Sequence, residues 1–190
     1  MSGKQTNYAK HHANMEFENL LGNVRQIFPF DKYSLIVKLW PNPELKTHLL
    51  YVAENNFDAA TLINSIKREP PEPFSGLKET KLPQMSGYAL RHHRDDALYL
   101  AREMRHELPI FASGGVAIEA VRLPPGWDGK SHVDEKFLQT NIEEGARDIR
   151  RCFELGASYV QLGSVAYIRG PLNLYDTIRG LLKELGLVNT

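Results

Sequence analysis

Glycine pairs and a few polar side chains follow the apolar, β-type runs of this chain, and their positions could serve chemistry. Gly114-Gly115 and Gly163-Ser164 each come directly after such a run. Glycine lets backbone N–H groups approach an anion without a Cβ atom in the way, and a following helix N-terminus adds a favourable dipole. Glycine after a strand is also common in simple turns, but its recurrence after two consecutive strands favours a phosphate site.

Lys38 and Asn64 each allow a chemical and an ordinary interpretation. Lys38 lies inside an apolar run, and a buried ammonium needs an acceptor or an anion, so a ligand could be its partner. A lysine on an edge strand that faces solvent is the alternative. Asn64, followed by Ser65, has the donors and the carbonyl to recognise an amide or a pyrimidine edge, although asparagine is also an ordinary turn residue.

Other polar residues do not form a convincing site. His92-His93 and Asp95-Asp96 are adjacent pairs, and neighbouring residues on a helix point in different directions, so a solvated helix start is the better interpretation than a metal site. Cys152, the single cysteine, lies mid-helix and is interpreted as a packing residue. No residue is identified as a catalytic base.

Composition limits the class of protein. The 190 residues include 23 basic and 23 acidic side chains, so no surplus of positive charge favours a nucleic acid partner. An apolar share of 42% and a charged share of 24% are ordinary for a globular domain. The sequence has no apolar run of membrane-spanning length and no secretory-type apolar block near Met1, so we expect neither a transmembrane segment nor secretion.

The elements that position these residues alternate between β-type and helical patterns, which predicts an α/β fold on a parallel sheet. One helix precedes four strands, each followed by a helix. The helices are expected at Met15–Ile27, Glu44–Glu54, Ala89–His106, Asn141 to about Gly156, and over the last run from Leu174, and the strands at Tyr33–Leu39, Ala59–Ile63, Pro109–Ser113 and Ser158–Leu162.

The chain divides into a flexible segment, residues 1–14, and one domain, residues 15–190. Two insertions interrupt this domain, at about residues 67–85 and 117–140, and both are rich in proline and charge. Asn141 is the expected N-cap of the helix that follows the second insertion.

Five runs appear in order near the expected strand ends: VKLWPN, LINSI, MSGYALR, PIFASGGV and GASYVQLGSVAYIRGP. Together they resemble the carboxyl-terminal half of the dihydroorotate dehydrogenases, which are FMN-binding TIM-barrel flavoproteins. The resemblance runs from about Met15 to the end of the sequence and is interrupted over residues 117–140. Barrels of this type have eight strands and about 250 residues. Four strands therefore imply a partial, half barrel.

The resemblance also implies roles for individual residues. Lys38 matches the lysine beside the flavin ring, where its charge would stabilise the reduced flavin. Asn64 and Ser65 are the implied substrate-binding residues, for dihydroorotate or orotate. The residues expected to contact FMN are Lys38, Ser86, Gly87, Gly114, Gly115, Gly163 and Ser164.

Two functions remain open at this level. One is the FMN-binding half of an oxidoreductase of pyrimidine biosynthesis, completed by a second chain or by self-association that covers the open half barrel and supplies the base. The other is a non-catalytic interaction subunit of a larger assembly, descended from such an enzyme. The resemblance allows a mitochondrial or a cytoplasmic location.

Overall fold

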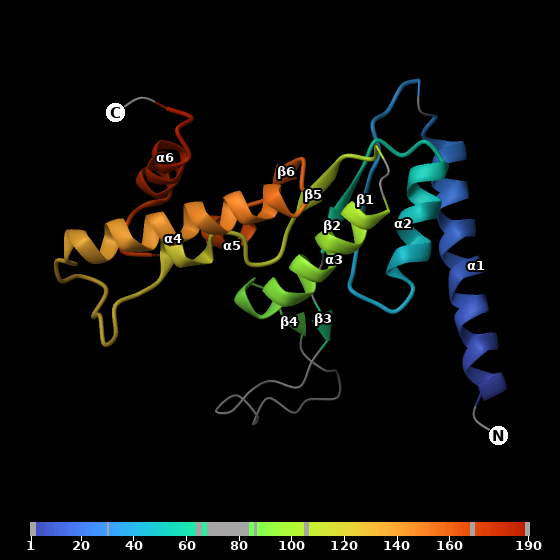
Figure 1. Ribbon diagram of the computed structural model, residues 1–190, viewed down its shortest axis with the longest axis horizontal. Coiled ribbons are helices and arrows are strands. Elements are labelled where there is room, and N and C mark those ends of the chain that lie inside the picture. Colours follow the sequence, from blue (N-terminus) through green and yellow to red (C-terminus); the bar gives the residue numbers. More distant parts are fainter. Residues whose placement is uncertain are drawn as a thin grey trace.

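The computed structural model describes residues 3–29, 31–63, 66–67, 84–85, 87–104, 107–167 and 170–188 (Figure 1). Asn64, Ser65 and Ser86 lie outside these ranges. The elements in chain order are α1 (Gly3–Ile27), β1 (Ile36–Leu39), α2 (Leu45–Glu54), β2 (Ala59–Leu62), β3 (Ile66–Lys67), β4 (Gln84–Met85), the 3₁₀ helix η2 (Gly87–Leu90), α3 (Arg91–Glu103), β5 (Ile110–Ala112), the 3₁₀ helix η3 (Ile118–Val121), α4 (Glu135–Glu154), β6 (Tyr159–Val160), α5 (Gly163–Tyr167) and α6 (Leu174–Glu184).

Four of the strands form one parallel sheet in the order β1-β2-β5-β6. A helix follows each of these strands along the chain, and α1 precedes the first, so the predicted α/β fold with four parallel βα units is confirmed. Figure 1 shows α1 and α2 side by side at one end of the molecule and α4 and α6 at the other.

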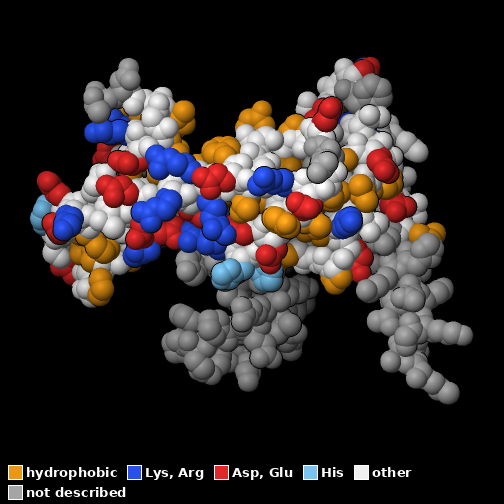
Figure 2. Space-filling model, in the orientation of Figure 1, with side chains coloured by type: hydrophobic (Ala, Val, Ile, Leu, Met, Phe, Trp, Pro, Cys, Tyr) orange, Lys and Arg blue, Asp and Glu red, His pale blue; other side chains and the backbone are white. Residues whose placement is uncertain are grey.

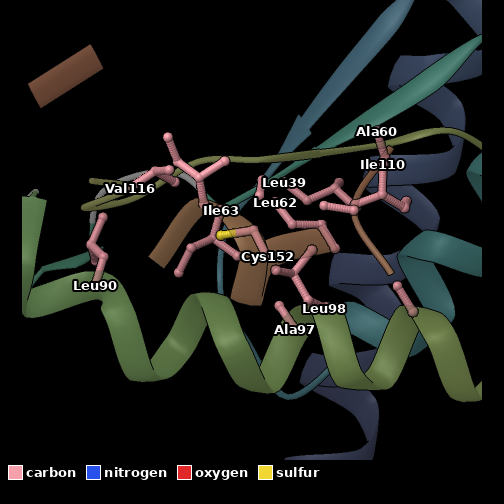
Figure 3. Packing of buried hydrophobic residues seen from close by; sticks show 14 of the residues in the cluster. Leu39, Ala60, Leu62, Ile63, Leu90, Ala97, Leu98, Ile110, Val116 and Cys152 are labelled. Atoms are coloured by element: carbon pink, nitrogen blue, oxygen red, sulfur yellow. The ribbon is translucent and has the colours of Figure 1, made fainter. Parts of the chain in front are cut away.

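One face of the sheet packs against helices and forms the core. Leu39, Leu62 and Ala112 lie in one row across β1, β2 and β5 and are fully buried. Figure 3 shows this face lying over Ala97 and Leu98 of α3. Removal of these side chains from water stabilises the fold by about 2 kcal/mol for each leucine.

The opposite face, the open face of the sheet, is exposed at its edges and buried at its centre, where Ala59 and Thr61 of β2 are 3% and 2% exposed. Lys38, Thr61, Phe111 and Tyr159 form a row across all four strands on this face, and the rings of Phe111 and Tyr159 stack with their centroids 4.6 Å apart. Ile36 at one edge is 51% exposed, and Tyr159 at the other edge is 54% exposed. Figure 2 shows hydrophobic side chains on the outline of the molecule near β5 and β6. A parallel sheet normally has both faces covered, so the exposed edges of this face are available for contact.

Several element boundaries differ from the prediction. The first helix begins at Gly3 rather than Met15, while the division of the chain at residue 14 stays a prediction. The Asn141 cap is wrong, because α4 begins two turns earlier and Asp134 caps it by accepting a hydrogen bond from Lys136 N. Asn141 is instead buried within α4, where its Nδ2 donates to Arg122 O at 3.2 Å.

The two predicted insertions contain structure. The ends of the 67–85 segment are joined, because β3 pairs antiparallel with β4. The 117–140 segment, for which no structure is predicted, contains η3 and the start of α4. None of the helices in the described ranges combines the length and the apolar composition needed to cross a membrane.

A buried histidine lies where α1 packs on α2. The ring of His48 stacks on Phe17 of α1 with the centroids 4.0 Å apart, and its residue is 5% exposed. Burial lowers the pKa of His48, and the negative charges of Glu44 and Glu18 only partly oppose this effect. The folded chain therefore favours neutral His48.

We expect this histidine to make stability depend on pH. Below about pH 6.5 an unfolded chain protonates His48, whereas the folded chain resists protonation because its pKa is lowered. The free energy of unfolding should therefore fall as the pH falls through this range, and His48→Gln should flatten the dependence. Urea unfolding midpoints at several pH values between about 5 and 8 measure it.

His132→Gln is the matched control, because His132 is exposed and should leave the pH dependence unchanged. An equal dependence in wild type and in His48→Gln would contradict the prediction.

Candidate functional site

The two glycine-containing turns lie next to each other on one rim of the sheet. Ala112 of β5 pairs with Val160 of β6, and both strands end there, so Gly114-Gly115 and Gly163 follow adjacent strand ends. Within the described residues, the N–H groups of Gly114, Gly115, Val116 and Gly163 donate no hydrogen bond. Gly163 is exposed and Gly114 partly exposed, whereas Gly115 and Val116 are buried, so the donors that this rim presents at the surface, unpaired among the described residues, are those of Gly114 and Gly163. Such donors suit an anion.

The glycines of the two turns differ in whether packing and backbone conformation require a glycine. Gly114 has φ +95°, and a Cβ atom there would lie 3.0 Å from Leu90 Cβ, so packing and conformation alone require glycine. Gly115 also has a positive φ, +72°. Gly163 is exposed, and a Cβ atom there would meet no atom of the described residues within 4 Å. Open space above a glycine is what close approach of a ligand needs.

The next N–H group of the glycine loop is already taken by a carboxylate of the protein. Ala117, which has φ +53°, donates its N–H to Asp148 Oδ2 at 3.0 Å. Asp148 comes from α4 and is 7% exposed. Burial by itself raises the pKa of Asp148, but hydrogen bonds from Arg94 and Ala117 and the charges of Arg94 and Arg91 lower the pKa below its ordinary value. The carboxylate is therefore ionised inside the loop.

Arg94 of α3 neutralises this carboxylate. Its Nη1 and Nη2 donate to the two oxygens of Asp148 at 2.9 and 2.8 Å, and its Nε and Nη2 donate to Asp95 Oδ1. Arg94 is 0% exposed, and burial would lower its pKa, but these carboxylates raise the pKa above its ordinary value. Arg151 in turn donates to Asp95 Oδ2 at 2.8 Å.

A second arginine joins the network to the glycine loop. Arg91 Nη2 donates to Glu119 Oε2 at 2.6 Å, lies 3.3 Å from Asp148 Oδ2, and reaches Gly115 O at 3.5 Å. Three arginines and three carboxylates are thus linked around the loop. The network is close to neutral, so the rim attracts an anion through its N–H dipoles rather than through net charge. Figure 2 shows basic and acidic side chains interspersed over α4.

Lys38 lies on the open face of the sheet rather than in the core. It is exposed on the edge strand β1, two strands from β5, which is about 10 Å at the usual strand spacing. In this structure Lys38 is thus a lysine on an edge strand that faces solvent. The Lys38 side chain can contact a ligand on the same face of the sheet. Next to it, Gln161 Nε2 donates to Thr61 Oγ1 at 3.5 Å.

The other predicted residues are only partly described. Gly87 is buried at the start of η2 with φ +70°. Ser164 follows Gly163 in α5. Asn64, Ser65 and Ser86 lie outside the described residues, so their predicted roles stay predictions.

The residues for which the sequence predicts no chemical role lie where they are expected, with the exception of Asp95. Cys152 is fully buried in the core, and burial raises the pKa of its thiol to about 12. His92 and His93 are exposed near the start of α3. Asp95, predicted to be solvated, is instead bound by Arg94 and Arg151.

Sequence reasoning missed Arg94 and Asp148 because neither follows a strand. A signal was present in the helical period. Asp148 is in phase with Gly145 and Cys152 on the buried stripe of α4, and Arg94 is in phase with Leu98 and Ala101 on that of α3. Opposite charges on the buried stripes of two sheet-covering helices predict an internal ion pair.

The fold is similar to that of a dihydroorotate dehydrogenase (DHODH) from Eimeria tenella, solved in complex with ferulenol. The TM-score is 0.51 and the identity 19%, and the match covers 83% of this chain and 36% of that chain. No family model and no curated protein matches the sequence. The chain thus spans about a third of the neighbour's length. At this identity the likeness shows the fold alone, and the predicted partial barrel is confirmed as a DHODH-like α/β fold.

Proposed function

We propose that this chain is the FMN-binding part of an oxidoreductase of the dihydroorotate dehydrogenase type. The proposal rests on the N–H groups at the adjacent ends of β5 and β6 that donate to no described residue, in a DHODH-like fold. The residues on this rim fit a phosphate. The phosphate would be held first through the N–H groups of Gly114 and Gly163, because Gly115 and Val116 are buried, and the space above Gly163 allows it to approach.

The open face of the sheet supports the rest of the proposal. Lys38 shares this face with Phe111 and Tyr159, so a cation and two aromatic rings lie on the same side of the sheet. FMN supplies hydride-transfer chemistry when it is bound. The Lys38 ammonium would stabilise negative charge that develops beside it, and Asn64 and Ser65 would bind the pyrimidine substrate.

A partner completes the proposed site. Ile36 and Tyr159 leave apolar surface exposed at both edges of the open face, which further strands of a barrel would cover. We propose that a second protein chain, or a second copy, supplies these strands together with the catalytic base. The Cys152 thiol cannot serve as that base because it is buried in the core.

The second candidate function is that of a non-catalytic interaction subunit. It is favoured by the same exposed apolar edges and by the near-neutral ion network, which leaves no charge surplus to attract a phosphate. A colourless protein that binds no FMN would support this function and overturn the first.

Binding of FMN tests the principal proposal. We expect the purified protein, together with whatever co-purifies, to show flavin absorbance and to bind added FMN. Gly163→Ala should weaken FMN binding by at least about tenfold, because a Cβ atom would enter the space that the phosphate needs. Fluorescence quenching of FMN measures the affinity.

Gly22→Ala is the matched control. Gly22 lies in α1 with room for a Cβ atom, 3.8 Å from Tyr51 Oη, so this variant should keep wild-type FMN affinity. Equal affinity of Gly163→Ala and wild type would argue against the phosphate position.

The role of Lys38 is tested by Lys38→Ala in the assembled protein. Loss of a charge that stabilises the transition state should slow flavin reduction by dihydroorotate about a hundredfold. Stopped-flow measurement of flavin bleaching gives the rate. Lys46→Ala, an exposed lysine of α2, should have no effect, and an unchanged rate in Lys38→Ala would remove Lys38 from the mechanism.

A further inference from the structure

We propose that Asp148 is a positioning residue that gives the glycine loop, residues 114–117, its selectivity for a phosphate group. The inference rests on the proposed function and adds a residue that never touches the ligand. Asp148 accepts the N–H of Ala117, the last residue of the loop, whereas the N–H groups of Gly114, Gly115 and Val116 donate to no described residue.

The carboxylate of Asp148 is held rigidly. Arg94 binds both of its oxygens, and Arg91 lies 3.3 Å from Oδ2 on another side. Arg94 itself is fixed by Asp95, and it is completely buried between α3 and α4. A charged group with this many partners cannot rotate away without leaving a buried charge unpaired, so it can serve as a fixed template for the loop.

The loop needs such a template because its backbone is unusual. Gly114, Gly115 and Ala117 all have positive φ, of +95°, +72° and +53°. Glycine adopts this region readily, but alanine does not, so the conformation at Ala117 persists only when its surroundings impose it. Two described hydrogen bonds hold it: Ala117 N–H donates to Asp148 Oδ2, and Ala117 O accepts from Ala120 N–H at 3.0 Å. The first of these depends on a side chain, that of Asp148.

An effect of the Asp148 charge and an effect of its position would change phosphate binding in opposite directions. A negative charge beside a phosphate site repels the phosphate, so an effect of charge alone would make binding tighter when Asp148 is neutralised. If Asp148 acts by position, neutralising it loosens the loop and binding becomes weaker. The direction of the change therefore separates the two roles.

The experiment compares FMN with riboflavin, which lacks the phosphate. The wild-type protein, assembled with whatever co-purifies, should prefer FMN by about a hundredfold, as expected for two hydrogen bonds to a charged oxygen. Asp148→Asn should reduce this preference to within about threefold of unity. Asp95→Asn is the matched control, because Asp95 binds the same arginine without touching the loop, and it should keep the preference.

Each outcome supports or overturns a stated claim. If the wild type binds neither flavin, or binds both equally, the proposed function loses its phosphate site. If the wild type prefers FMN and Asp148→Asn prefers it as strongly or more strongly, the positioning role is wrong. Loss of the preference in Asp95→Asn as well would show that general loosening of the network, not Asp148, is responsible.

Circular dichroism would show whether Asp148→Asn folds. If it does not fold, two further measurements still test the proposal. Asp148→Glu keeps the charge but moves the carboxylate, and it should also lose the preference. In the wild type, hydrogen exchange should be slow at Ala117 N–H and fast at Gly114 and Gly115, with inorganic phosphate alone slowing the latter two. Fast exchange at Ala117, or no response of the glycines to a phosphate that binds, would overturn the role of Asp148.

Discussion

The ion pair between Arg94 and Asp148 joins three parts of the molecule that are distant in sequence: α3, α4 and the loop that follows β5. A buried pair gains little net stability, because removal of two charges from water offsets most of their attraction. The pair instead favours one arrangement of the helices and the loop, because few other arrangements give both buried charges a partner. Arg94 makes four hydrogen bonds to two carboxylates, and Asp148 adds one to a backbone N–H. The pair therefore specifies how the helices and the loop meet.

The residues on the two faces of the sheet have different roles. Because side chains alternate along a strand, Leu39 and Leu62 build the core while Lys38 and Thr61, each one residue earlier, face the other way. The core face depends on α2 and α3, and the glycine turns extend beyond the ends of β5 and β6. Both the ligand and the partner are inferred from a face with exposed edges that lies beside a rim of N–H groups with no acceptor among the described residues.

The sequence predicts the order and type of the sheet elements because short apolar runs and helical stripes differ in period. It fails at boundaries that long-range contacts decide. Asn141 has the type of an N-cap, but burial against Arg122 keeps it inside α4, and Asp134 caps the helix instead. It also misses Asp148, since a charged residue on a helix normally faces solvent and only its partner, 54 positions away, explains its burial. The glycines at strand ends are found because their signal is local.

The glycines do not contribute equally to the case for a ligand. Gly114 would be required in a protein that binds nothing, because its positive φ and its contact with Leu90 exclude other residues. Gly163 has neither constraint, since it is exposed and has open space where a side chain would lie. Helix α5 begins at Gly163, where alanine would be the better helix former. Among the described residues nothing requires glycine at position 163, and the neighbouring loop has N–H groups without an acceptor, so Gly163 is the stronger argument for a phosphate on this rim.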